Sequence, residues 1–177
     1  MKKSSLILAA VTAGALVMAA NLPSALAASA STSPGITVSA GVLRTCTIQK
    51  VTDIAFGNYD PVGVNATADL TANGTIRVHC NRNTLADITL SNGNNPSGSQ
   101  RRMASSTTSD FLNYNLQKPL ADGTTNSNTA WDTYAYAQGS TTGVRDLTVF
   151  GVIPQAQNSS AAGDYTDTVV ATITFTP

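Results

Sequence analysis

The clearest alternation of apolar and polar residues lies at the end of the chain, from 163 to 177. Its apolar side chains share one parity: Tyr165, Val169, Ala171, Ile173 and Phe175. A period of two with β-branched and aromatic residues predicts a strand that buries one face. The sequence offers no later residues to pair with the free edge of this strand, and a long open edge favours pairing with another chain. We therefore expect an edge strand whose partner lies elsewhere.

A second alternating segment occupies residues 35–42, near the start of the chain. Its apolar residues again share one parity: Ile36, Val38, Ala40 and Val42. The residues before it, 28–34, are small and polar and favour a flexible segment. The sequence thus combines a strand that has an open edge with a short strand that has no evident partner in its own domain.

Short alternating runs separated by polar loops fill the rest of the chain. They predict strands at 44–48, 74–80, 85–90, 101–104, 111–116 and 147–153, a short strand or hairpin at 131–136, and an apolar segment at 54–57 before a turn. Within 74–80, Ile76, Val78 and Cys80 are expected to face inward. The helix formers Glu, Lys, Gln and Met are scarce, whereas strand and turn residues are abundant. The sequence predicts an all-β sandwich of two sheets and about seven strands.

The first 27 residues have the pattern of a signal peptide. Lys2 and Lys3 give a positive start, residues 6–20 are apolar, and 25–27 provide the small-x-small site that a signal peptidase cleaves. A membrane anchor is disfavoured because the apolar run is shorter than the ~20 residues that span a bilayer. Cleavage after Ala27 of the 177-residue chain leaves 150 residues, which suits one domain. We expect this domain to be exported without membrane insertion.

The exported chain contains two cysteines, Cys46 and Cys80. In an oxidising compartment each can pair only with the other, so a disulfide is the default prediction. Such a bond closes a long loop and would stabilise the fold by ~4 kcal/mol in the chain-entropy model. A free reactive thiol or a metal-binding pair is the alternative.

Composition and charge argue against several classes of function. After cleavage the chain has 8 Lys and Arg, 10 Asp and no Glu, and its net charge of −2 makes nucleic acid and anionic membranes poor partners. Its one histidine, His79, lies within a predicted strand and supports neither a catalytic triad nor a histidine metal site. The aspartates are better explained as loop and strand-edge residues than as paired glycosidase carboxylates. We therefore expect no catalytic residues, no cofactor and no metal.

Several motifs, taken in their order along the chain, resemble the spore coat protein U family. The most specific part is an FGxYD motif after the first cysteine followed by a GxYxDT motif near the end. The family includes the major subunits of archaic chaperone–usher pili of the Csu type. The motifs are Cys46-Thr47-Ile48, Ile54-Ala55-Phe56-Gly57-Asn58-Tyr59-Asp60, Gly74-Thr75-Ile76-Arg77-Val78-His79-Cys80, Arg102-Met103, Leu112-Asn113-Tyr114, Trp131 and Gly163-Asp164-Tyr165-Thr166-Asp167-Thr168-Val169.

The resemblance implies an incomplete immunoglobulin-like sandwich that lacks its seventh strand. Residues 28–43 would form a donor-strand extension, and residues 44–177 would form the pilin domain. A periplasmic chaperone would fill the empty position first, and at an outer-membrane usher the N-terminal strand of the next identical or related subunit would replace it. Such a head-to-tail contact generates a filament. The donor side chains would be Ile36, Val38, Ala40 and Val42, and one wall of the acceptor groove would be Tyr165, Val169, Ala171, Ile173 and Phe175.

The function implied is that of a structural pilus subunit, which passes through the periplasm and forms surface fibres for attachment and biofilm formation. One alternative is a secreted coat protein of the same family that decorates a spore or cell surface. Another is a glycan-binding adhesin at a pilus tip. The aromatic residues Trp131, Tyr134 and Tyr136 could contact a glycan or a neighbouring subunit, or they could pack in the core.

Overall fold

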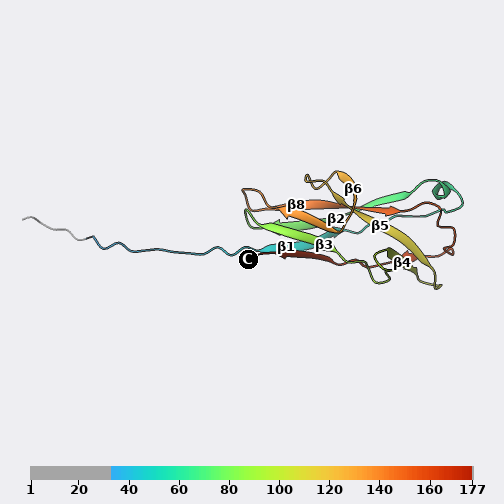
Figure 1. Ribbon diagram of the computed structural model, residues 1–177, viewed down its shortest axis with the longest axis horizontal. Coiled ribbons are helices and arrows are strands. Elements are labelled where there is room, and N and C mark those ends of the chain that lie inside the picture. Colours follow the sequence, from blue (N-terminus) through green and yellow to red (C-terminus); the bar gives the residue numbers. More distant parts are fainter. Residues whose placement is uncertain (1–32, 177) are drawn as a thin grey trace, which may run out of the picture. The chain divides into compact units, whose positions relative to one another are not determined.

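The computed structural model describes residues 33–176 (Figure 1). The chain divides into two units, Met1–Ala40 and Gly41–Pro177. In the first unit, residues 33–40 are exposed and have no regular secondary structure, and the predicted signal peptide lies outside the described residues. The elements of the second unit are β1 (Cys46–Thr52), the 3-10 helix η1 (Val64–Ala66), β2 (Leu70–Cys80), β3 (Leu85–Leu90), β4 (Arg101–Ser105), β5 (Phe111–Pro119), β6 (Asn126–Ala130), β7 (Thr133–Ala137), β8 (Gly143–Ile153), β9 (Tyr165–Thr166) and β10 (Ala171–Phe175).

Antiparallel pairing arranges these strands in two sheets. The larger sheet has the order β1-β2-β8-β5-β4-β9, with β6 beside β5, and the smaller sheet has the order β10-β3-β7. Strands β2 and β8 pair along their whole length, from Leu70↔Ile153 to Cys80↔Gly143. The predicted all-β fold is confirmed. Between residues 33 and 176, no helix is long and apolar enough to cross a membrane.

One hydrophobic core lies between the two sheets, built from alternate residues of their strands. Trp131, just before β7, is 2% exposed, and its indole Nε1 donates a hydrogen bond of 3.1 Å to Ile88 O. The ring of Tyr134 lies 5.8 Å from that of Trp131, and Tyr136 is also buried. The aromatic cluster therefore packs in the core. The other buried apolar residues are Ile76, Val78, Cys80, Ala86, Ile88, Leu90, Leu112, Tyr114, Leu116, Leu147, Val149 and Ile153.

The predicted disulfide is present and joins Cys46 at the start of β1 to Cys80 at the end of β2. These two cysteines are also directly opposite each other in the register of the two strands. The residues predicted to face inward on β2, Ile76, Val78 and Cys80, are all buried. The covalent bond therefore fixes one end of β1 to the larger sheet.

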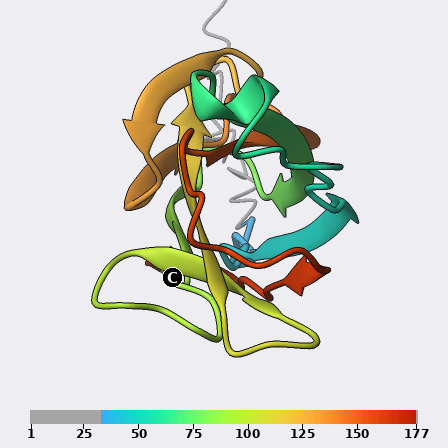
Figure 2. The ribbon, with the colours of Figure 1, turned by 90° about the vertical axis from the view of Figure 1, so that its right-hand side faces the viewer.

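The predicted continuous strand at the end of the chain is wrong, because its two halves belong to different sheets. β9 pairs with β4 in the larger sheet, whereas β10 pairs with β3 in the smaller one. Residues 167–170 between them are not in a strand. In the end view of Figure 2, the red segment that follows β8 reaches down towards the yellow-green β4. The sequence alternates throughout, but the chain has to cross between two layers, and tertiary pairing overrides local propensity.

Other element boundaries also differ from the prediction. The first strand begins at Cys46 and continues to Thr52, so Arg44 precedes it. Strand β6 was not predicted, because Asn126–Ala130 lacks an apolar alternation and owes its conformation to pairing with β5. The apolar segment at 54–57 is not a strand. Its side chains instead fill space that two glycines of the sheet leave open, since a Cβ on Gly74 would collide with Ile54 and one on Gly151 with Phe56.

Candidate functional site

Each sheet has an outer strand next to the other sheet, and the outer edge of each of these two strands has no hydrogen-bonded partner within the described residues. β1 is an outer strand of the larger sheet and β10 is an outer strand of the smaller one. The two strands lie next to each other, as the cyan and dark red arrows in the lower part of Figure 1 show, yet they belong to different sheets. Both edges therefore present backbone N–H and C=O groups that a further strand could bind.

A cavity of about 460 Å³, which we call the edge groove, opens between β1 with the segment after it and the link that leads from β9 to the start of β10. Residues of β1 and the segment after it form one wall, and the other wall is formed by Tyr165, Thr166, Asp167, Val169 and Ala171. Its apolar lining comes from both sheets: Ile48, Ile54, Phe56, Ile76, Leu90, Met103, Leu116, Val149, Tyr165, Val169 and Ala171.

Many apolar side chains of the sandwich, including several that line the edge groove, are only partly buried. They pack against the buried core but stay partly exposed, and they are Cys46, Ile48, Ile54, Phe56, Tyr59, Leu70, Met103, Tyr165, Val169, Ala171, Ile173 and Phe175. Complete burial of a large apolar side chain stabilises by ~1.5–3 kcal/mol. The half-buried set therefore favours binding of another apolar segment.

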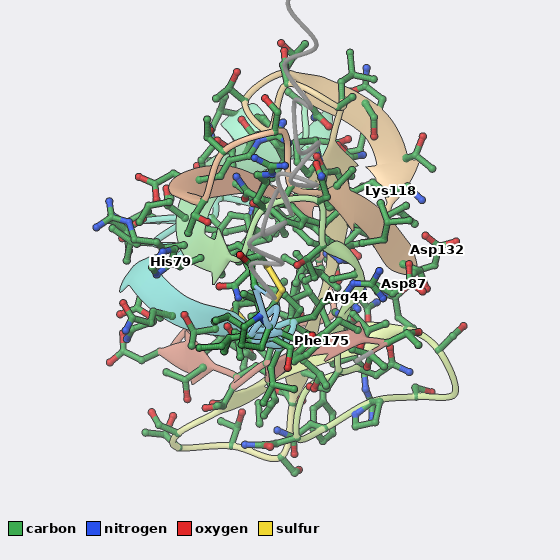
Figure 3. The ribbon with its side chains drawn as sticks, turned by 90° about the vertical axis from the view of Figure 1, so that its left-hand side faces the viewer. Arg44, His79, Asp87, Lys118, Asp132 and Phe175 are labelled. Atoms are coloured by element: carbon green, nitrogen blue, oxygen red, sulfur yellow. A yellow bond between two sulfur atoms is a disulfide. The ribbon has the colours of Figure 1, made fainter. Side chains whose placement is uncertain are left out.

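The two ends of the edge groove differ. Near the disulfide, β10 packs close to β1, and Ile173 and Phe175 do not line the groove. Figure 3 shows Phe175 close to Arg44, at the end of the molecule where β1 begins. At the opposite end, the groove is lined by Ile54, Phe56, Tyr165, Thr166, Asp167 and Val169. We call these the disulfide end and the Asp167 end.

The residues predicted to line one wall are thus divided between the two ends. Tyr165, Val169 and Ala171 line the edge groove, whereas Ile173 and Phe175 pack against the core beside it. All five are half-buried. Their assignment as an acceptor wall stays a prediction.

The predicted donor residues are exposed. Ile36, Val38 and Val42 have exposed fractions of 89%, 90% and 88%, and Ala40 is exposed as well. Residues 33–45 form no strand. Fully exposed alternating valine and isoleucine side chains are unusual in a folded protein, because apolar residues of this kind are normally buried. Their role as a donor strand also stays a prediction.

Polar groups line the Asp167 end of the edge groove, and sequence reasoning had assigned them no role. The hydroxyl of Tyr114 donates a hydrogen bond of 2.6 Å to Asp167 Oδ2. Burial raises the pKa of Tyr114, and the hydrogen bond to Asp167 adds to this effect. Lys50 Nζ lies 2.9 Å from Asp53 Oδ1 at the exposed rim. The resemblance motifs contained Tyr114 and Asp167, which was the one signal that could have indicated them.

Within residues 33–176, no group of three or more His, Cys, Asp or Glu side chains could hold a metal ion. His79 lies on the exposed face of β2, opposite Thr47 of β1. An apolar groove between two unpaired edges is instead suited to binding an extended polypeptide segment.

Comparisons with known proteins reveal relatives of this chain in sequence and in fold. A model of the Spore Coat Protein U domain matches residues 33–172. Protein U of Myxococcus xanthus is 34% identical over 138 residues, which cover 68% of this chain and 70% of that protein. The crystal structure of the P pilus rod subunit PapA is similar over 74% of this chain and 99% of that chain, with a TM-score of 0.51 and 13% identity, which shows a shared fold.

A further match is the crystal structure of the CsuC–CsuE chaperone–tip adhesion subunit pre-assembly complex from the archaic chaperone–usher Csu pili of Acinetobacter baumannii. It covers 75% of this chain and 40% of that chain, at 27% identity and a TM-score of 0.49. Neither Protein U of Myxococcus xanthus nor the subunit PapA is named as an enzyme.

Proposed function

Because the chain belongs to the Spore Coat Protein U domain family, we propose that it is a structural pilus subunit that polymerises by donor-strand exchange. The observation that carries this proposal is the apolar edge groove next to two outer strands, β1 and β10, whose outer edges have no partner within the described residues. A strand inserted there would pair with both edges and complete the sandwich. The neighbouring copy supplies this strand from its residues 33–43.

The sequence of the proposed donor suits the edge groove. Ile36, Val38, Ala40 and Val42 share one parity, so an extended segment places all four side chains on one face. Each new backbone hydrogen bond contributes ~1 kcal/mol and each buried large side chain ~1.5–3 kcal/mol. Ordering the segment costs ~1–2 kcal/mol per residue. Insertion is therefore favourable only when both apolar surfaces are fully covered.

The proposal also includes the partners that handle the subunit before assembly. A subunit with an open apolar groove needs cover before assembly, since exposed apolar patches lead to unspecific association. In this proposal a periplasmic chaperone covers the edge groove, and an outer-membrane usher is the site where the next subunit replaces it. The assembled fibre lies at the cell surface and serves attachment and biofilm formation.

The test compares two versions of the mature protein purified from the periplasm, the full chain and one that lacks residues 28–42. Size exclusion with mass determination and electrophoresis without heating measure the assembly state. We expect the full chain to give a ladder of SDS-resistant multimers and the truncated chain to give none. A ladder that persists after truncation would refute the donor assignment.

A secreted coat protein is the second candidate, and the similarity to Protein U of Myxococcus xanthus favours it. In that case the alternating segment at 35–42 would insert into the edge groove of its own domain. The full chain would then stay a stable monomer, and its melting temperature would fall on removal of residues 28–42.

A further inference from the structure

The Asp167 end of the edge groove contains a polar network that the proposed function leaves unexplained. Asp167 lies in the link between β9 and β10, where the chain crosses from one sheet to the other. Its Oδ2 accepts the hydrogen bond from Tyr114 of β5, and its Oδ1 accepts one of 2.8 Å from the backbone N–H of Asn94. One carboxylate thus joins the link to the larger sheet and to the loop after β3.

Gly93 shows how closely this loop approaches the carboxylate. Its φ is +80°, a left-handed conformation that favours glycine. A Cβ on Gly93 would collide with Asp167 Oδ2. The carboxylate therefore occupies the space beside Gly93 that a larger residue would need.

A second pair of contacts holds the downstream side of the link. The N–H of Ser91 donates to Val170 O, and the N–H of Val170 donates to Ser91 Oγ, both over 2.9 Å. Arg101, which is 8% exposed, donates from Nε to Ser91 O and from Nη2 to Leu90 O, also over 2.9 Å. The end of β3 to which the link is attached is thus itself fixed to β4.

The two ends of the edge groove show what the network does. At the disulfide end, where β10 has no such anchor to the larger sheet, β10 packs close to β1 and the groove does not extend between them. At the Asp167 end the groove is open, although apolar side chains line both of its walls. Because apolar walls across an empty groove favour closure, something has to hold this end open. The carboxylate of Asp167 lies in the wall at that point.

We propose that Tyr114 and Asp167 are positioning residues for strand uptake, which hold the open end of the edge groove at the width that an incoming strand requires. This inference rests on the proposed function and adds to it the residues that keep the empty subunit ready to accept a strand. The incoming strand then enters at the Asp167 end and displaces β10 from β1 as it proceeds towards the disulfide end.

The test measures uptake of a fluorescent peptide with the sequence of residues 33–43 by the monomeric fraction of the full mature chain. Asp167→Asn removes the charge but keeps the shape of the side chain, and Tyr114→Phe removes only the hydroxyl. Asp164→Asn is the matched control, because Asp164 is an exposed carboxylate on the same segment that does not line the edge groove. Hydrogen exchange of the amides at 168–171 and the melting temperature are recorded for each variant.

We expect Asp167→Asn and Tyr114→Phe to slow uptake about tenfold, as is typical for loss of a buried hydrogen bond to a charged group. The hydrogen-exchange rates of the amides at 168–171 should change in both variants and stay unchanged in the control, Asp164→Asn. Uptake at the wild-type rate in both variants would overturn the proposal. So would a slower uptake that is fully matched by a lower melting temperature, because the two residues would then be merely structural.

The result also separates this inference from the proposed function. If the wild-type chain takes up no peptide, donor-strand exchange itself fails, and the positioning role fails with it. If the wild-type chain takes up peptide and the variants do so equally well, only the positioning role is refuted.

Discussion

The closed and open sides of this sandwich are built from the same kind of sequence but differ in burial. On the closed side, β2 and β8 pair over eleven residues each, and their inward side chains Val78 and Leu147 are fully buried. On the open side, β10 alternates just as regularly and β1 alternates over residues 46–49, yet their inward residues, such as Ile48 and Ile173, stay half-buried. Alternation shows which face of a strand is apolar, but it does not show whether the covering strand belongs to the same chain.

The largest effect is expected where a charge enters the proposed donor strand. Val38→Asp would place a carboxylate in the apolar groove of the neighbouring subunit, and a buried unpaired charge is strongly unfavourable. We expect the SDS-resistant ladder to disappear. Because Val38 is 90% exposed in the structure, the melting temperature of the monomer should not change.

Ser39→Asp is the matched control for this variant. It introduces the same charge one residue further along, on the opposite parity, where the side chain of an inserted strand faces solvent. We expect it to polymerise normally. Normal filaments from Val38→Asp, or an equal loss in both variants, would show that the donor register or the donor assignment is wrong.

The second largest effect is expected on removal of the disulfide at the disulfide end of the edge groove. Replacing both cysteines, Cys46→Ser with Cys80→Ser, opens a loop of 34 residues. In the chain-entropy model this lowers the free energy of unfolding by about 4 kcal/mol. Urea unfolding of the oxidised wild type and of the double variant measures the difference. A loss well below 1 kcal/mol would mean that β1 is held by its pairing with β2 alone.

The third prediction compares an isoleucine on the closed side of the sandwich with one on the open side. Ile88 is fully buried between the sheets, whereas Ile48 lines the edge groove. We expect Ile88→Ala to cost about 2–5 kcal/mol of stability and Ile48→Ala about half as much, since solvent already reaches Ile48. Urea unfolding with and without the peptide of residues 33–43 sharpens the comparison. Only the cost of Ile48→Ala should rise when the peptide is bound.

The contrast between the closed and open sides also explains how much of the fold can be predicted from the sequence. Local signals were sufficient for the all-β class, for the inward residues of β2, and for the pairing of two lone cysteines. They failed at 167–170, because the partner strands β4 and β3, rather than the local alternation, decide where the last strand breaks. They also failed at β6, whose polar residues become a strand only beside β5.

The candidate site was predicted in part for a related reason. The alternation of the last strand indicated Tyr165, Val169 and Ala171, which line the edge groove. It could not indicate Tyr114 or Leu90, because these come from strands of both sheets that only folding brings together. A hydrogen bond between residues 53 positions apart, such as that of Tyr114 with Asp167, leaves no pattern in a single sequence.

The smallest effect lies far from the edge groove, at the surface pair of Lys118 and Asp132 labelled in Figure 3. Lys118 Nζ lies 2.7 Å from Asp132 Oδ1, and the hydrogen bond from Lys118 lowers the pKa of Asp132 from 3.8 to about 2. A carboxyl group whose pKa is lower in the folded state than in the unfolded state stabilises the fold at pH values above its unfolded-state pKa. This stabilisation is lost as the pH falls through the folded-state pKa. Melting temperatures should therefore stay level above pH 5 and decline below pH 4, less steeply in Asp132→Asn. Because Asp132 is fully exposed, the change is small. Lys118→Met should reduce the decline to the same extent, and a double variant that differs from both singles would show that the two groups act independently.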